Sequence, residues 1–318
     1  MTSNRLHPGP GEVVLRLRYA GLCGTDLFKL QYGTVPEGSV LGHEVVGTVE
    51  EIGDGVLGFL PGDRVAVAHH VPCGVCGLCR RGSEPLCPAF RENLLVPGGF
   101  SEHILVRERA VRHAMFGLPP HVSDETAVFL EPAACVLRGI RQARVSELPP
   151  PASVAILGGG SMGLLHLLVL QAVLPGARVA VLDLVEERVR RARELGAAEA
   201  IEGADVVFDT AGGARALDSA LRLVRPGGTV VLFAHAAAGE QASLDINAFF
   251  KTEGKLIATY SSSPAEQREI HRLMTSRRLD PSPLVTHRLP LSRFDEAVAL
   301  ARDRQALKVL LTPEETEA

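Results

Sequence analysis

The chain has 318 residues, a length typical of about two domains, and 46% of its residues are apolar, enough for sizeable cores. Lys and Arg number 33 against 37 Asp and Glu, a net charge of -4, so charge gives no basis for binding nucleic acid or an anionic membrane. The longest apolar run, residues 164–174, is too short to span a bilayer and contains His166 and Gln171. Residues 1–11 lack the apolar core of a signal peptide, so we expect a cytoplasmic protein.

Short stretches of alternating apolar and polar residues fill the first third of the chain. Turns such as Pro61-Gly62-Asp63 separate these stretches. Alternation with a period of two predicts strands that bury one face. The expected strands cover residues 12–20, 44–52, 64–68 and 100–106. We therefore expect a mostly β domain in this part of the chain.

The pattern changes near residue 125, where a helix is expected over residues 125–147, ended by three prolines at 149–151. Short apolar runs then alternate with helical stretches, which is typical of a parallel, doubly wound sheet. Strands are expected at 154–157, 179–183, 206–209 and 229–234, and helices at 163–174, 186–195 and 214–224. A last helix, over about 264–278, precedes a tail rich in strands that includes residues 308–311.

Four of the six cysteines cluster within fifteen residues: Cys73, Cys76, Cys79 and Cys87, spaced C-x2-C-x2-C-x7-C. Thiolates at such short spacings can surround one zinc ion as a tetrahedron, and four protein ligands leave no position for a substrate. Four unrelated buried thiols, a redox pair and an iron–sulfur cluster are the alternatives, but four cysteines this close disfavour the first two and the usual iron–sulfur spacings differ from this one. The cluster therefore predicts a structural zinc site.

A second group of metal donors lies earlier in the chain. Cys23 stands in Gly21-Leu22-Cys23-Gly24-Thr25-Asp26, and His43 and Glu44 follow Gly42. Three protein ligands and a water are the usual form of a catalytic zinc site. A single Cys is more often a core residue, and a His–Glu pair more often lies at the surface. The residues alone therefore leave this second site open.

A glycine-rich turn follows the strand expected at 154–157 and opens a helix. Its sequence, Gly158-Gly159-Gly160-Ser161-Met162-Gly163, satisfies the G-x-G-x-x-G pattern. Gly158 permits a tight turn, Gly160 lets a pyrophosphate approach the backbone, and Gly163 allows the helix to pack closely on the strand. The helix N-terminus offers amides and a positive dipole end to the phosphates. A turn without a ligand is the alternative interpretation, which this strand–turn–helix context disfavours.

Other candidate cofactor contacts follow the next strands. Asp183 comes twenty residues after Gly163, at the end of a strand, where a carboxylate binds the ribose hydroxyls and repels a 2′-phosphate. This placement favours NAD over NADP. Thr210 and Phe233 follow two later strands, and we expect them near the nicotinamide because open α/β sheets bind ligands at the carboxyl ends of their strands.

These motifs occur in the same order in zinc-containing medium-chain dehydrogenases, together with Pro97-Gly98-Gly99-Phe100-Ser101-Glu102. Over nearly its whole length the chain resembles the branch that contains sorbitol, threonine and glucose dehydrogenases. The resemblance implies an α/β protein with a GroES-like, mostly β catalytic domain at residues 1–136 and 280–318. It also implies an NAD-binding Rossmann domain, with a doubly wound parallel sheet, at residues 137–279. Two zinc ions, NAD and a homodimeric or homotetrameric assembly are implied as well.

The resemblance also assigns roles to the second group of donors. Cys23 and His43 match the catalytic zinc ligands of the family, and Glu44 matches a close or direct ligand. Glu131, in Leu130-Glu131-Pro132, matches a glutamate that binds zinc directly or through its water. Cys135 lies four residues further on and is interpreted as a buried helix thiol.

Thr25 matches the hydroxyl that relays the proton in the family, and Asp26 is expected to hold the imidazole of His43. Many relatives carry a histidine relay residue at the position of Phe28, so proton release here needs another route, such as Glu44, Glu131 or a chain of waters. Arg188 resembles a position near the adenosine, and it also fits a solvated helix arginine. His69 and His70, just before the cysteine cluster, fit surface turn residues better than a pocket wall.

The implied reaction is the oxidation of a secondary alcohol to a ketone, with hydride transfer to NAD. A bound zinc ion lowers the pKa of a substrate hydroxyl, which makes the alkoxide accessible near neutral pH. The substrate classes left open are polyols, sugars, amino alcohols and related small molecules. A zinc-free reductase on the same scaffold and a catalytically inactive NAD-binding protein are the two alternatives.

Overall fold

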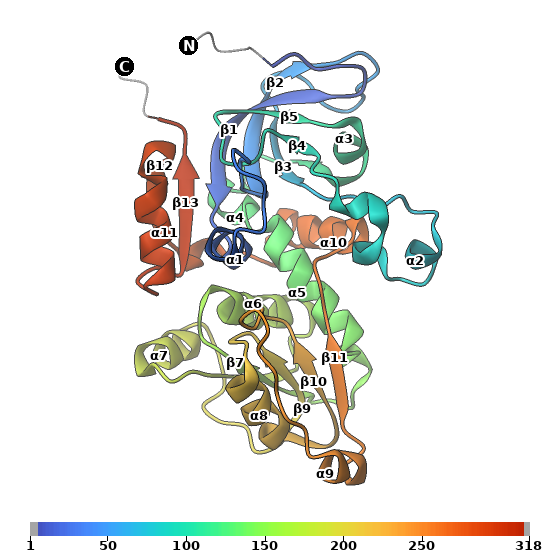
Figure 1. The fold of residues 1–318 in the computed structure, drawn as a ribbon, viewed down its shortest axis with the longest axis vertical. Coiled ribbons are helices and arrows are strands. Elements are labelled where there is room, and N and C mark those ends of the chain that lie inside the picture. Colours follow the sequence, from blue (N-terminus) through green and yellow to red (C-terminus); the bar gives the residue numbers. More distant parts are fainter. Residues whose placement is uncertain (1–5, 315–318) are drawn as a thin grey trace. The chain divides into compact units, whose positions relative to one another are not determined.

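Alternating residues near the start of the chain form a sheet in the computed structural model, which describes residues 6–314 (Figure 1). Its eight strands follow the order β12-β13-β1-β2-β3-β6, and β5 joins β1 to β4. All neighbours are antiparallel except β12 and β13. The strands are β1 (Val13–Gly21), β2 (Glu44–Ile52), β3 (Arg64–Ala68), β4 (Leu95–Val96), β5 (His103–Val106), β6 (Met115–Gly117), β12 (Val285–Pro290) and β13 (Lys308–Thr312).

The inward residues of β1, β2, β3 and β5 form the core of this sheet, joined by residues of α3 (Glu108–Ala114). Leu15, Val65 and Ile104 are fully buried there, as period-two alternation predicts. The other helices of this unit are α1 (Gly24–Tyr32), α2 (Gly77–Arg80), α4 (Asp124–Ala127), α10 (Pro264–Thr275) and α11 (Phe294–Arg302).

Five parallel strands form a second sheet, in the order β11-β10-β9-β7-β8. These strands are β7 (Ser153–Leu157), β8 (Arg178–Leu182), β9 (Ala204–Asp209), β10 (Val224–Leu232) and β11 (Lys255–Ala258). They alternate along the chain with α6 (Ser161–Val173), α7 (Glu186–Glu194), α8 (Ala214–Leu223) and α9 (Ile246–Lys251). The strand order reverses between β7 and β9, which makes this a doubly wound sheet with a ligand-binding switch point at that place. The predicted fold class is confirmed.

The described chain forms two units, Met1–Ala134 with Ser262–Ala318, and Cys135–Ser261. The boundary falls inside α5 (Leu130–Gln142). We expected the second domain to extend to residue 279, but α10 belongs to the first unit because it packs against α3 and α4.

One helix was expected over residues 125–147, and the structure divides this stretch. Ser123 caps α4 by accepting a hydrogen bond from the amide of Thr126 at 3.0 Å. A new helix, α5, begins at Leu130 with Pro132 in its first turn, where the missing amide hydrogen costs nothing. This break places Glu131 at a helix N-terminus. Over residues 6–314, we find no helix with the length and hydropathy needed to cross a bilayer.

Candidate metal centres and cofactor site

Four thiols gather in the lobe between β3 and β4. The Sγ atoms of Cys73, Cys76, Cys79 and Cys87 all lie within 4.8 Å of one another. The sulfur of Cys79 lies 3.5 Å from that of Cys76 and 3.9 Å from that of Cys73. Two short 3₁₀ helices, η1 (Glu84–Leu86) and η2 (Pro88–Arg91), lead into and out of Cys87. The lobe thus brings together all four predicted ligands.

The surroundings of two of these thiols shift their pKa values in opposite directions. The amides of Val75 and Cys76 lower the pKa of Cys73 to about 6, whereas burial and the Cys76 thiol raise the pKa of Cys79 to about 12. Four thiolates this close ionise together only when a cation compensates their charge. The donor set therefore fits a closed, structural zinc site.

The second group of donors forms where β1 and β2 meet. Gly21, the last residue of β1, pairs with Glu44, the first residue of β2. Cys23 follows just before α1, and His43 precedes Glu44. The donor atoms of Cys23, His43 and Glu44 lie within 4.8 Å of one another. Three converging donors suit a metal ion that keeps an open position for another ligand.

Asp26 holds two of these donors in place. It is fully buried, its Oδ2 accepts the amide hydrogen of Cys23 at 3.1 Å, and its Oδ1 lies 3.3 Å from Nδ1 of His43. Burial by itself raises the pKa of Asp26, but the His43 charge and hydrogen bond lower it below its usual value. Because Nδ1 of His43 faces this carboxylate, the Nε2 lone pair is left for a metal. This is the role that the sequence predicted for Asp26.

Burial by itself lowers the pKa of His43, whereas the charges of Asp26 and Cys23 raise it well above its ordinary value. The pocket around His43 therefore favours a positive charge. The same negative charges would also stabilise a metal cation bound to these donors.

Lys308, on β13, pairs with Glu44 in the interior. The two side chains are 4% and 0% exposed, and Lys308 Nζ contacts Glu44 Oε2 and donates to the carbonyl of Leu22 at 3.2 Å. Among the described residues, Glu44 Oε1 has no hydrogen-bond partner. One carboxylate oxygen is thus neutralised, while the other is left for a cation. A Cβ on Gly21 would overlap Glu44 Oε2, so this packing requires glycine there.

Three other residues predicted from the sequence, Thr25, Glu131 and Phe28, lie outside this set of three donors. Thr25 lies in the first turn of α1, two residues after Cys23. Glu131 is 8% exposed at the start of α5, but the set of mutually close donor atoms does not include it. The ring of Phe28 lies 4.6 Å from that of Tyr32 on the same helix. The role of Glu131 as a ligand stays a prediction.

The Pro97-Gly98-Gly99 turn supports the approach to His43. The amide of Gly99 donates to the carbonyl of Gly42 at 3.0 Å, and the amide of Phe100 donates to that of Leu41 at 2.9 Å. This turn, noted in the sequence only as a family motif, thereby anchors the segment just before His43.

His69 and His70 are half-buried, and their rings stack beside His43. Burial lowers the pKa of His69 well below its ordinary value and that of His70 to about 4, so both rings are neutral at pH 7. Sequence reasoning favoured surface turn residues here. In the sequence, only their position directly after the strand at 64–68 could have indicated that they lie beside His43.

The glycine-rich turn joins β7 to α6 as predicted. A Cβ on Gly163 would overlap the carbonyl oxygen of Gly158, so α6 packs closely only with glycine there. Gly160 precedes the first helical residue, Ser161, and a Cβ on Gly160 would meet no atom of the described residues within 4 Å, its chain neighbours aside. The hydroxyl of Thr210 donates to the Leu157 carbonyl at 2.8 Å and so braces this turn.

Asp183 lies directly after β8 beside this turn. Its Oδ2 accepts the amide hydrogen of Gly159 at 2.7 Å, and its Oδ1 accepts that of Val185 at 2.8 Å. Arg188 Nη1 lies 3.5 Å from Oδ2. Burial raises the pKa of Asp183, but these amides and Arg188 outweigh it, so the carboxylate ionises below its usual range.

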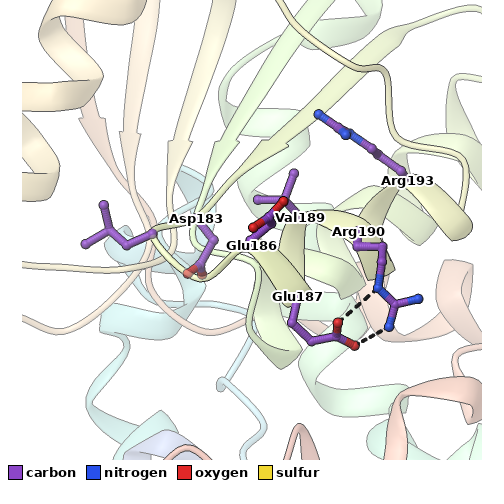
Figure 2. A pocket seen from close by; sticks show the side chains of 7 residues that line it. Asp183, Glu186, Glu187, Val189, Arg190 and Arg193 are labelled. Carbon is purple, nitrogen blue, oxygen red and sulfur yellow. Dashed lines mark hydrogen bonds and ion pairs between the residues drawn. The ribbon is translucent and has the colours of Figure 1, made fainter.

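A pocket of about 690 Å³ adjoins Asp183 along α7 (Figure 2). Glu187 and Arg190 form a surface ion pair on its wall, and Arg193 also lines it. The pocket therefore combines the carboxylate of Asp183 with both acidic and basic side chains, and its Arg190 is already paired with Glu187 and Glu194.

Met162 and Phe233 are linked by a residue that sequence reasoning did not assign, His166. This fully buried side chain donates from Nδ1 to the Met162 carbonyl at 2.7 Å, and its ring meets that of Phe233 edge-on at 4.4 Å. Its signal in the sequence was a titratable residue inside an otherwise apolar helix.

Two family models match the chain. The alcohol dehydrogenase GroES-like domain matches residues 9–115, and the zinc-binding dehydrogenase model matches residues 199–276. The chain is similar to sorbitol dehydrogenase of Halalkalibacterium halodurans, with 29% identity covering 96% of this chain and 93% of the relative. It is 32% identical to D-altritol 5-dehydrogenase of Agrobacterium fabrum, covering 90% of this chain and 87% of the relative.

The fold is also similar to a solved structure, a zinc-binding dehydrogenase from Sinorhizobium meliloti 1021 bound to NADP. That structure is 28% identical with a TM-score of 0.84, covering 97% of this chain and 94% of the other. The predicted resemblance is thereby confirmed, and the site fits a zinc-dependent, NAD(P)-linked dehydrogenase acting on CH–OH groups. The protein belongs to the zinc-containing medium-chain alcohol dehydrogenase family.

Proposed function

We propose that this enzyme oxidises the secondary alcohol of a polyol, sugar, amino alcohol or related small molecule to a ketone, with NAD as the acceptor. The observation that carries the proposal is the convergence of Cys23, His43 and Glu44, oriented by Asp26 and Lys308. The alcohol carbon loses a hydride to the nicotinamide and the hydroxyl loses a proton, giving ketone, NADH and a proton. Two of the relatives act on polyols by their names, which supports this substrate class.

A zinc ion bound at this group would lower the pKa of the substrate hydroxyl. We assign to Thr25 the relay of the hydroxyl proton, because it lies two residues after Cys23 in the first turn of α1. Glu131 would act as a further ligand, directly or through water, and the free oxygen of Glu44 would face the ion. With Phe28 at the relay position, the carboxylates of Glu44 and Glu131 or a chain of waters would pass the proton outward.

The preference for NAD rests on Asp183. Two backbone amides orient its ionised carboxylate, which would accept bonds from ribose hydroxyls and repel a 2′-phosphate. The turn from Gly158 to Gly163 would hold the pyrophosphate, with Arg188 near the adenosine and Phe233 on the nicotinamide side. The nearby arginines and the NADP-bound neighbour are reasons to measure both cofactors.

The decisive test is an assay of nicotinamide reduction over polyols, sugars, aminocyclitols, amino alcohols and simple secondary alcohols, each with NAD and with NADP. The matched control is Cys23→Ala, which we expect to bind cofactor but lose activity. Activity that survives this substitution, or a wild-type protein purified without zinc yet fully active, would establish a zinc-free reductase instead. An absence of turnover with zinc and NAD bound would favour an inactive NAD-binding protein.

We also propose a cytoplasmic homodimer or homotetramer, as the family resemblance implies. Fractionation of cells and light scattering on the purified protein test these two points.

A further inference from the structure

Four aromatic rings form a continuous stack between the two groups of metal donors. The ring centroids of His43 and His69 lie 4.8 Å apart, those of His69 and His70 3.6 Å, and those of His70 and Phe90 4.8 Å. His43 is a donor of the catalytic group. Phe90, 3% exposed, packs in one cluster with Cys79 and Cys87 of the lobe. The stack thus runs from one donor group to the other.

Backbone pairing sets the inner end of the stack. Glu44 at the start of β2 pairs with Ala68 at the end of β3, so His43 and His69 are the next residues outward on adjacent strands. Residues returning from the lobe secure the two histidines. The carbonyl of Glu92 lies 3.1 Å from Nδ1 of His70, and the Leu94 amide donates to the His69 carbonyl at 3.2 Å.

Ring packing, more than hydrogen bonding, orients the middle of the stack. Among the described residues, the buried Nδ1 of His69 has no hydrogen-bond partner. The rings of His43 and His70 contact it instead. Aromatic pairs at such separations contribute energy beyond simple burial. A displaced His70 would therefore leave the ring of His69 free to turn, and His43 would lose its neighbour.

We propose that His69 and His70 are positioning residues that couple the cysteine lobe to the catalytic metal site through the ring of Phe90. Closing the lobe around an ion fixes Cys87, and the Phe90 amide donates to the Cys87 carbonyl at 2.9 Å within η2. The position of Phe90 then supports His70, which supports His69 and finally the imidazole of His43. An intact lobe thereby raises metal affinity at the catalytic site.

This inference rests on the catalytic metal site of the proposed function, but not on any substrate. The catalytic ion is removed with a chelator and replaced by Co²⁺ in the full-length protein, with zinc kept in the lobe. The thiolate–cobalt absorption band, which Cys23→Ala must abolish, reports affinity for Co²⁺ in competition with the chelator. Lobe zinc is counted in parallel in every variant.

We expect His70→Ala and Phe90→Ala each to weaken Co²⁺ binding about five-fold, the change that ~1 kcal/mol produces. The matched control is His70→Phe, which keeps a ring but not the bond to Glu92, and it should stay within about two-fold of wild type. The double variant His70→Ala/Phe90→Ala should be no weaker than either single variant, because one gap already interrupts the stack. Should His70→Ala fail to fold, His70→Leu removes the ring but keeps apolar volume.

Four results would overturn the inference. Unchanged Co²⁺ affinity in the ring-deleting variants with lobe zinc retained would show that the stack carries no coupling. Equal losses in His70→Phe and His70→Ala would assign the effect to the bond with Glu92. Additive losses in the double variant would mean that the two residues act separately. A wild-type protein without a Cys23-dependent band would refute the catalytic metal site itself, and the coupling with it.

Discussion

Removal of the Lys308 charge is the sharpest test of whether Lys308 stabilises the buried carboxylate of Glu44. In Lys308→Met, the carboxylate of Glu44 stays in a site where the two side chains are 4% and 0% exposed, but it loses its counter-charge. Breaking a buried ion pair by removing one partner costs about 3–5 kcal/mol, because the remaining charge is uncompensated. In a unit of this size, that cost lowers Tm by roughly 10 °C.

The chain contains no tryptophan, so calorimetry and far-UV circular dichroism suit this measurement. The control is Lys308→Met/Glu44→Gln, which removes both charges. We expect this double variant to be more stable than Lys308→Met, although it carries one more substitution. A bound cation would compensate the carboxylate, so the loss in Lys308→Met should be larger without metal than with it. A Tm within about 2 °C of wild type without metal, or a double variant less stable than the single one, would refute this account.

The remaining predictions concern pH, cofactor choice and metal content. Burial lowers the pKa of His166 to about 4, so the unfolded chain binds more protons than the native chain between pH 6.5 and 4. Unfolding free energy should therefore fall by about 3 kcal/mol more in wild type than in His166→Leu as pH drops through that window, and parallel urea-unfolding curves would contradict this. Asp183→Gly should raise the KM for NAD about tenfold while affecting the KM for NADP less. Unchanged steady-state kinetics would contradict the proposed contact between Asp183 and the ribose. Cys87→Ser and Cys23→Ala should each lose zinc by elemental analysis, but only Cys87→Ser should sharply lower Tm. Equal Tm values in the two variants would contradict the assignment of the structural role to the cysteine lobe.

The cysteine lobe and the cofactor turn were predictable from the residues because their chemistry resides in short segments, whereas the second donor group was assigned through the family resemblance. The cysteines of the lobe span fifteen residues, so no distant contact is needed to bring the sulfurs together. Cys23 and Asp26 are three residues apart at the start of one helix, and His43 adjoins Glu44. The turn from Gly158 to Gly163 likewise needs only a strand before it and a helix after it.

The partners of these groups depend on sheet pairing between distant parts of the chain. Lys308 reaches Glu44 across 264 residues of sequence, because β13 and β2 both pair with β1. Nothing in the residues around Lys308 predicts that contact. The stack from His43 to Phe90 likewise requires the register of β2 against β3 and the return of the lobe.

The sequence by itself determined the fold class, the cysteine donors and the glycine turn, because local patterns dictate each of them, and its family resemblance assigned the second set of metal donors. Only the tertiary structure decided which charges and rings support those donors, where the helix near Leu130 begins and which unit holds α10. The physical reason is burial, because a polar or charged side chain such as Lys308 or His166 is costly to bury unless long-range packing supplies its partners. That packing is set by the register of whole strands, and no short window of sequence contains it.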